Sequence, residues 1–114
     1  MNKVLYIILI SLFSFTIFSC AKKDSTSSTT SSPLYVAVGD NGTGSGTILT
    51  SPDGTTWTER TSGTTEVLLG VTYGNGLFVT VGTSGTILTS SDGTTWTSRT
   101  SGTSEDFNGV IYSQ

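Results

Sequence analysis

Carboxylates are the side chains of this chain that could carry acid–base chemistry, because its 114 residues include eight Asp and Glu, no His and one Cys. This composition excludes a Ser–His or Cys–His catalytic pair, a zinc cluster and an intrachain disulfide. Hydrolysis of a glycosidic bond would need two carboxyl groups about 5 to 9.5 Å apart, at least one with a shifted pKa. Asp53 and Asp92 lie in predicted turns, and Glu59 and Glu66 lie beside Thr and Ser residues. We therefore expect no catalytic residue and no enzyme activity.

A second candidate for chemistry is the oxygen-rich and glycine-rich loop over residues 40–46, Asp-Asn-Gly-Thr-Gly-Ser-Gly. Such a loop could offer oxygen ligands to calcium or backbone amides to an anion. It contains one acidic residue and lacks EF-hand spacing and a following helix. We interpret it as a lengthened hairpin loop and expect neither a metal site nor a cofactor.

The single cysteine, Cys20, follows an apolar run over residues 4–18 that is preceded by Lys3. The run is short for a membrane span of about 20 residues and typical of a signal-peptide core of about 7 to 15 residues. The sequence Ile17-Phe18-Ser19-Cys20 resembles the lipobox of bacterial lipoproteins. This resemblance implies a signal peptide over residues 1–19, cleavage before Cys20 and acylation of its thiol. The alternatives are an ordinary cleaved signal peptide or an uncleaved anchor with an incidental cysteine.

The lipoprotein resemblance also implies a location. Two or three acyl chains hold a protein on a membrane more firmly than one chain does, so membrane lipid is an expected partner through Cys20. Ala21 follows the cysteine where Asp is the usual retention signal, which implies the outer membrane of a bacterial cell envelope. Residues 20–32 are rich in Ser and Thr and predict a flexible tether.

The charge balance bears on other partners. Five Lys and Arg against eight Asp and Glu give a net charge of −3, so a nucleic-acid partner is not expected, since no basic stripe exists to contact phosphates. Arg60 and Arg99 could contact an acidic partner. Alternatively, they are solvated strand residues paired with Glu59 or Glu66, and such exposed pairs contribute little to stability.

The chain from residue 33 to residue 114 repeats itself with a period of 39, since residues 46–64 recur almost unchanged as residues 85–103. Short runs rich in Val, Ile, Leu, Thr, Tyr and Trp alternate with Gly, Asn and Asp clusters, which predicts brief strands joined by tight turns. Four antiparallel strands in about 40 residues are one blade of a β-propeller. We predict an all-β fold with strands at residues 34–38, 47–51, 56–60, 68–73, 77–81, 86–90, 95–99 and 107–112.

Residues 51–57 read Ser-Pro-Asp-Gly-Thr-Thr-Trp, and residues 90–96 read Ser-Ser-Asp-Gly-Thr-Thr-Trp. These stretches resemble the Asp-box, or BNR, repeat (Ser-x-Asp-x-Gly-x-Thr-Trp), and the whole unit is similar to the propeller repeats of the photosystem II assembly factor-like group. Both copies lack the residue between Asp and Gly. The resemblance implies that the Asp caps the backbone amides of its hairpin, that the Trp packs between blades, and that active-site residues lie elsewhere. The residues that match the box are Ser51, Asp53, Gly54 and Trp57 in the first copy and Ser90, Asp92, Gly93 and Trp96 in the second.

The predicted strands add up to two blades, circularly split: three strands, then four, then one. Propellers usually close with 4 to 8 blades, and repeat stacks generally need three or more units. Three solutions remain open. Several copies assemble a ring, three making six blades or four making eight, with residues 107–112 supplying the missing strand; or a two-blade sheet or sandwich persists as a monomer with exposed edges; or the chain is the truncated remnant of a longer propeller lipoprotein.

These observations predict a membrane-anchored, non-catalytic lipoprotein that presents propeller blades as a surface for protein binding or assembly. The alternative is a glycan-binding lectin or a vestigial sialidase-like glycosidase, in which an exposed Trp57 or Trp96 would stack on a sugar. A sialidase would also need an arginine cluster and a tyrosine nucleophile, whereas the predicted domain offers only Arg60 and Arg99.

Overall fold

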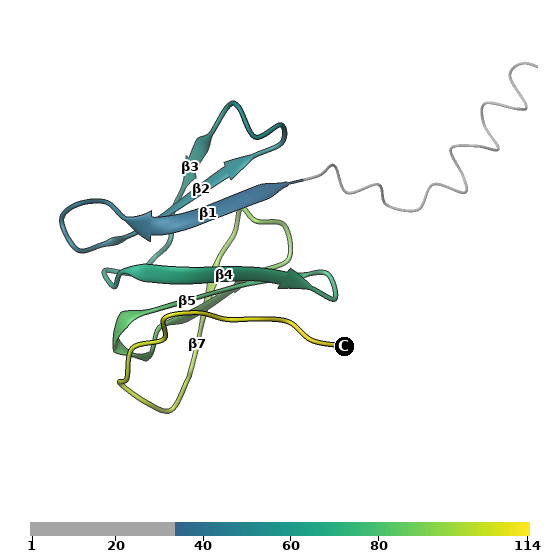
Figure 1. Ribbon diagram of the computed structural model, residues 1–114. Helices are drawn as coiled ribbons and strands as arrows, with labels where there is room; N and C mark the ends of the chain where they lie inside the picture. The colour runs from purple at the N-terminus through teal and green to yellow at the C-terminus, as the bar shows by residue number, and fades with distance from the viewer. Residues whose placement is uncertain (1–33) are drawn as a thin grey trace, which may run out of the picture. The chain divides into compact units, whose positions relative to one another are not determined.

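The computed structural model describes residues 34–114, which form seven strands and one short 3-10 turn in two antiparallel sheets (Figure 1). This confirms the all-β prediction. In the part of the chain that is described, no helix has the length and apolar character needed to cross a bilayer. The predicted signal peptide (1–19), Cys20 and the tether (20–32) lie outside the described residues.

The first sheet contains β1 (Tyr35–Asp40), β2 (Gly46–Ser51) and β3 (Thr58–Arg60), in that order. Residues 35–40 of β1 pair without interruption with residues 51–46 of β2. The loop over residues 40–46 therefore closes a hairpin. Among the described residues, β1 pairs with β2 alone, so it is an edge strand of this sheet.

The second sheet contains β4 (Leu68–Gly74), β5 (Leu77–Gly82), β6 (Ile87–Ser90) and β7 (Thr97–Arg99), with the 3-10 turn η1 (Thr83–Gly85) between β5 and β6. The β4–β5 hairpin turns at Asn75 and Gly76, which both have positive φ, 49° and 76°. Asn and Gly are the residues that adopt this conformation most readily, so the turn lies where the sequence predicts it.

The two sheets share one core, formed by Ile48 from β2, Leu68 from β4 and Leu88 from β6. Val36, Val38 and Trp96 pack against this cluster. β1 and β4, the first strands of the two sheets, lie side by side (Figure 1). The core is small for about 80 residues, because the strands are short and rich in Thr and Ser.

Two of the predicted strands are shorter in the structure than expected. β3 and β7 begin at Thr58 and Thr97, two residues later than expected, because the turn of each Asp-box-like stretch occupies the chain up to its Trp. The remaining five predicted strands that formed agree with the structure to within two residues at each end.

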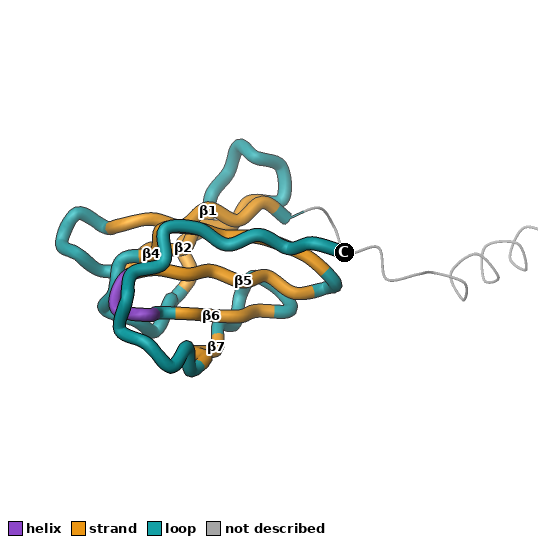
Figure 2. The backbone as a smooth tube through the Cα atoms, turned by 60° about the horizontal axis from the view of Figure 1, so that its bottom comes forward, coloured by secondary structure: helices purple, strands orange, loops and turns teal. Residues whose placement is uncertain are grey.

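The eighth predicted strand, over residues 107–112, does not form. This segment runs beside the second sheet without joining it (Figures 1 and 2). It is attached by the Phe107 N–H, which donates to the Gly82 carbonyl (3.0 Å), and by the close approach of Gly109 to Gly70. Its repeat equivalent, β4, becomes a strand by pairing with β5. Within the described residues, no later strand follows the segment to pair with it in the same way.

Candidate functional site

Each Asp-box-like stretch, hereafter a box, forms a turn held by one serine and one aspartate. In the first box (Ser51–Trp57), the Ser51 hydroxyl donates to Asp53 Oδ1 (3.0 Å) and accepts from the Gly54 N–H (2.8 Å). Asp53 Oδ1 also accepts from the N–H groups of Thr55 (2.8 Å) and Thr56 (2.9 Å). Gly54 has a φ of 76°, in the left-handed region that favours glycine.

The second box (Ser90–Trp96) repeats this geometry. Ser90 Oγ lies 3.0 Å from Asp92 Oδ1 and 2.8 Å from the Gly93 N–H, and Asp92 Oδ1 accepts from Thr94 (2.8 Å) and Thr95 (2.9 Å). Both aspartates therefore cap backbone amides through Oδ1. Within residues 34–114, the hydrogen bonds of these two carboxylates are all made inside their own turns, so both act as structural elements of the fold.

These amide bonds lower the pKa of both Asp53 and Asp92. The largest contribution comes from the N–H three residues later, the next from the N–H two residues later, and a smaller one from the serine hydroxyl. Hydrogen bonds to the charged form favour that form. A general acid at neutral pH needs the opposite shift, so neither carboxyl suits that role.

The two box tryptophans differ in their surroundings. Trp96 Nε1 donates to the Gly93 carbonyl (3.0 Å), and the Trp96 ring lies 6.4 Å from the Phe78 ring. It packs against the core between the sheets. Trp57, at the same repeat position, is 42% exposed. Of the pair, only Trp96 thus lies between sheets, and Trp57 presents its ring to solvent.

Each of the two arginines binds the hydroxyl of a threonine in its own sheet, and not Glu59 or Glu66 as the sequence allowed. Arg60 Nε donates to Thr50 Oγ1 (2.8 Å) in the first sheet, and Arg99 Nε donates to Thr89 Oγ1 (2.9 Å) in the second. Each bond uses one of the five N–H donors of a guanidinium. Among the described residues, the other four N–H donors of each arginine make no hydrogen bond, so they could bind the acidic partner that the sequence suggested.

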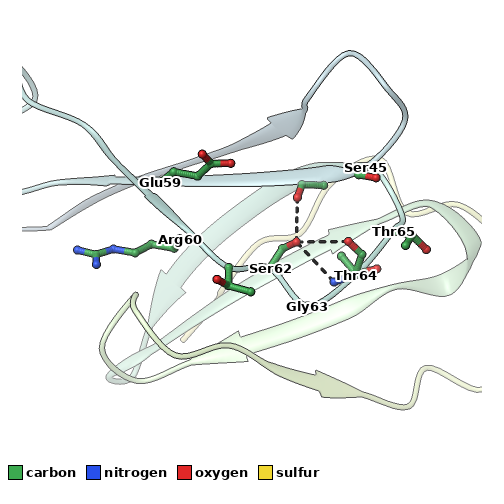
Figure 3. A pocket seen from close by; sticks show the side chains of 9 residues that line it. Ser45, Glu59, Arg60, Ser62, Gly63, Thr64 and Thr65 are labelled. Carbon is green, nitrogen blue, oxygen red and sulfur yellow. Dashed lines mark hydrogen bonds between the residues drawn. The ribbon is translucent and has the colours of Figure 1, made fainter.

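Each arginine lines an open polar groove, and the two grooves are repeat equivalents. The first groove has a volume of about 550 Å3 (Figure 3). The second has a volume of about 720 Å3. Adding 39 to each residue of the first groove gives a residue of the second, with one further residue, Thr86, in the second. The first is lined by Ser45, Gly46, Glu59, Arg60, Thr61, Ser62, Gly63, Thr64 and Thr65.

The floor of the first groove is ordered by Ser62. Its hydroxyl donates to the Gly46 carbonyl (2.8 Å) and so ties the loop after β3 to the start of β2 (Figure 3). Gly63 then turns the chain with a φ of 72°. The Arg60 side chain points away from these bonds (Figure 3). The groove therefore combines a fixed hydroxyl-rich loop with an arginine directed along the sheet.

The two grooves differ mainly in charge. Glu59 in the first corresponds to Ser98 in the second, and Thr65 corresponds to Ser104. The first groove thus has one acidic and one basic side chain, and the second has the arginine alone. An anionic group is expected to bind the second groove more strongly, because no carboxylate there opposes it.

One cluster was missed by the sequence analysis. Glu66 Oε2 accepts from Thr83 Oγ1 (3.0 Å) and Ser84 Oγ (2.8 Å), and Asp106 Oδ1 accepts from the Ser84 N–H (2.9 Å). These carboxylates bind η1 to the connection before β4 and to the C-terminal segment. Separations of 17 to 22 residues along the chain give no local signal for such bonds.

The lengthened loop over residues 40–46 uses its oxygen atoms internally. Asp40 Oδ1 accepts from the N–H groups of Gly42 (2.9 Å) and Gly44 (3.0 Å). Asn41 Oδ1 accepts from the N–H groups of Thr43 (2.9 Å) and Ser45 (3.2 Å). Within residues 34–114, no group of three or more His, Cys, Asp and Glu side chains is placed to hold a metal ion.

Fold and site together define an all-β protein with two sheets, a duplicated Ser–Asp turn and a duplicated arginine groove. Comparisons with protein-family models, with curated proteins and with solved structures found no significant match. The function must therefore be argued from these residues.

Proposed function

We propose that this chain is a membrane-anchored, non-catalytic lipoprotein of the bacterial cell envelope, held at the outer membrane through acylated Cys20, and that it presents propeller-type blades to an acidic protein partner. The observation that carries the proposal is the pair of equivalent grooves, each with an arginine beside a hydroxyl-rich loop. Duplicated binding grooves are what a repeat protein offers to an extended or repeated partner.

Support for propeller-type blades comes from the second sheet. Its strands follow the chain order β4-β5-β6-β7, each antiparallel to the next. A propeller blade is a four-stranded antiparallel sheet, so this strand order supports the proposal. The first sheet contains the equivalents of the last three of these strands, and its side chains meet those of the second sheet in the shared core.

Support for an acidic partner comes from guanidinium chemistry. Arginine binds carboxylates with two parallel N–H···O bonds, which adds both energy and orientation. The grooves are open and lined by Ser, Thr and Gly, so they fit a polar surface or an extended peptide. Small-molecule sites, in contrast, are usually enclosed and mostly apolar.

Binding of a fluorescently labelled hexaglutamate peptide to the full-length protein in detergent micelles tests the groove. We expect measurable binding that weakens with added salt and falls at least tenfold when Arg60 and Arg99 are both changed to Gln. Glu59→Ser, which gives the first groove the composition of the second, should strengthen binding. Equal binding by the double arginine variant, or equal binding of a hexaglutamine peptide, would contradict the proposal.

The anchor is tested separately. Cys20→Ala should release the protein from bacterial membranes and abolish incorporation of labelled palmitate, with the grooves unaffected. Membrane retention of the variant, together with no palmitate in the unaltered protein, would remove the lipoprotein part of the proposal and leave the groove part standing.

Glycan binding is the second candidate, and the exposure of the Trp57 ring favours it. An exposed indole is a common platform for the apolar face of a sugar. A glycan array of the full-length protein would show micromolar binding to a defined sugar, and the binding would be lost in Trp57→Ala. Retention of the same signal in that variant, or an array without signals, would exclude this candidate.

A further inference from the structure

The two sheets are copies of one repeat and contact each other through different faces. Each sheet therefore carries, on the face that points away from the contact, the residues equivalent to those that its partner sheet uses in the contact. The first sheet contributes Val36, Val38 and Ile48 to the shared core. Their equivalents at the same ladder positions of the second sheet are Val79, Val81 and Ile87. The loop between β1 and β2 is four residues longer than the connection between β5 and β6, so the two valines are offset by 43 residues and the isoleucine by 39. These three side chains lie on the face of the second sheet that points away from the first, where Val81 is buried within one copy (5% exposed) and Val79 and Ile87 are partly buried.

Strand register establishes this orientation. Leu88 is in the shared core and pairs with Thr80, so both face the first sheet. Val79 and Val81 flank Thr80 along β5 and therefore point to the opposite face. Ile87 pairs with Val81 and shares that face. The far face of the second sheet thus repeats the apolar set with which the first sheet contacts its neighbour.

The outer face of the first sheet carries the other half of the same contact. The second sheet contributes Leu88 and Trp96 to the shared core, and their equivalents in the first sheet are Leu49 and Trp57. Trp57 is exposed, although its equivalent is covered by the neighbouring sheet. Among residues 34–114, the first sheet therefore has no neighbour on its outer side that corresponds to the one beside the second sheet.

The first strand and the C-terminal segment are complementary in strand pairing as well. β1 is the equivalent of β5, and it is the edge strand of its sheet. The strand that pairs with β5 is β4, whose equivalent is the C-terminal segment over residues 107–112. That segment lies on the second sheet with Ile111 87% exposed and Tyr112 46% exposed. Its residues Val110, Ile111 and Tyr112 bound a cavity of about 250 Å3 together with Leu77 and Val79 of β5.

We propose that a second copy of this chain covers the far face of the second sheet, and that residues 107–112 of one copy form the missing strand beside β1 of the next. The pairing register follows from β4 and β5. Val71 pairs with Thr80, so Val110 of one copy should pair with Ala37 of the next.

The contact joins different faces of the two copies, the far face of one to the outer face of the other. Such a heterologous contact either closes into a ring or continues as an open filament. In both cases it removes the exposed edge of β1, which otherwise presents unpaired backbone groups to other chains. The inference goes beyond the proposed function and does not rest on the arginine grooves.

Cysteine cross-linking tests the register. Full-length Ala37→Cys and Val110→Cys variants with different tags are co-expressed, oxidised and examined on non-reducing gels, with peptide mass spectrometry to identify the bond. We expect a disulfide between positions 37 and 110 of different chains, at least tenfold more abundant than in a control pairing of Ala37→Cys with Thr97→Cys. Equal yields in the two mixtures would overturn the proposed pairing, and disulfides involving Cys20 are distinguished by their peptides.

Analytical ultracentrifugation in detergent gives a second test. The unaltered protein should sediment as an assembly at micromolar concentration, and Ile111→Asp should sediment as a monomer. Ile111 is almost fully exposed, so this change leaves the packing within one copy intact. An unaltered protein that stays monomeric up to about 100 μM would refute the inference.

Discussion

Leu88→Ala should destabilise the protein by about 3 kcal/mol, while the same change at the repeat-equivalent Leu49 should cost about 1 kcal/mol. Leu88 is 2% exposed and contacts Ile48 and Leu68 in the core. Removing three buried carbon atoms at about 0.8 kcal/mol each costs about 2.4 kcal/mol, and the cavity left behind adds to this. Leu49 is half-buried, so about half of the transfer term is lost and a smaller cavity remains.

Urea unfolding of the full-length protein, followed by tryptophan fluorescence, measures both changes. For a domain of about 80 residues, about 3 kcal/mol corresponds to a fall in Tm of roughly 12 to 24 °C. The measurement is made at several protein concentrations, because assembly of copies would cover Leu49 and raise its cost. The reasoning is refuted if, at the lowest concentration, Leu49→Ala costs as much as Leu88→Ala.

Three further changes have expected outcomes. Hydrogen bonds lower the pKa of Asp53 and Asp92 in the folded protein. The stability that these bonds provide is therefore complete above the unfolded pKa near 3.9 and is lost as the pH falls through the folded pKa. Changing both residues to Asn should flatten the fall in urea midpoint between about pH 5 and pH 2, and an unchanged slope would contradict this. Ser90→Ala should cost about 1 to 3 kcal/mol, because it leaves the buried Gly93 N–H unpaired. Ser51→Ala should cost less, because Gly54 is exposed and water can bond its N–H instead. Equal urea midpoints of the two variants would contradict this dependence on the exposure of the glycine. Gly74→Ala would place a methyl group in the Tyr112 ring, so it should detach the C-terminal segment and make that segment more sensitive to proteolysis. Gly109→Ala should have little effect, because the added atom meets nothing within 4 Å. Identical digestion of the two variants would contradict the contact between Gly74 and Tyr112.

The strands could be predicted from the sequence because their limits are local. Asn75 and Gly76 turn the β4–β5 hairpin through positive φ values, and the Ser51–Asp53 bonds span two residues. Such signals are contained in a few neighbouring residues. The late start of β3 has a local cause too. Asp53 binds the N–H groups of Thr55 and Thr56, so these residues belong to the turn although their residue types suggested a strand.

Burial of equivalent residues could not be predicted in this way. Leu49 and Leu88 have the same sequence surroundings, yet only Leu88 is fully covered. The difference arises from the position of each sheet in the molecule, since the second sheet has a neighbour on the face that contains Leu88. The grooves also depended on distant contacts, because Ser62 reaches Gly46 across 16 residues.

Residues 107–112 show why a local strand pattern is not sufficient to form a strand. Their sequence has the pattern of β4, and they already lie against the second sheet through Phe107 and Gly109. What they lack is the ladder partner that β5 provides for β4. A strand requires both a suitable sequence and a neighbouring edge with unpaired backbone groups, and within the described residues the equivalent edge belongs to β1. Because β1 is an edge strand in every copy, a chain of copies can supply each segment with the partner that a single copy does not place beside it.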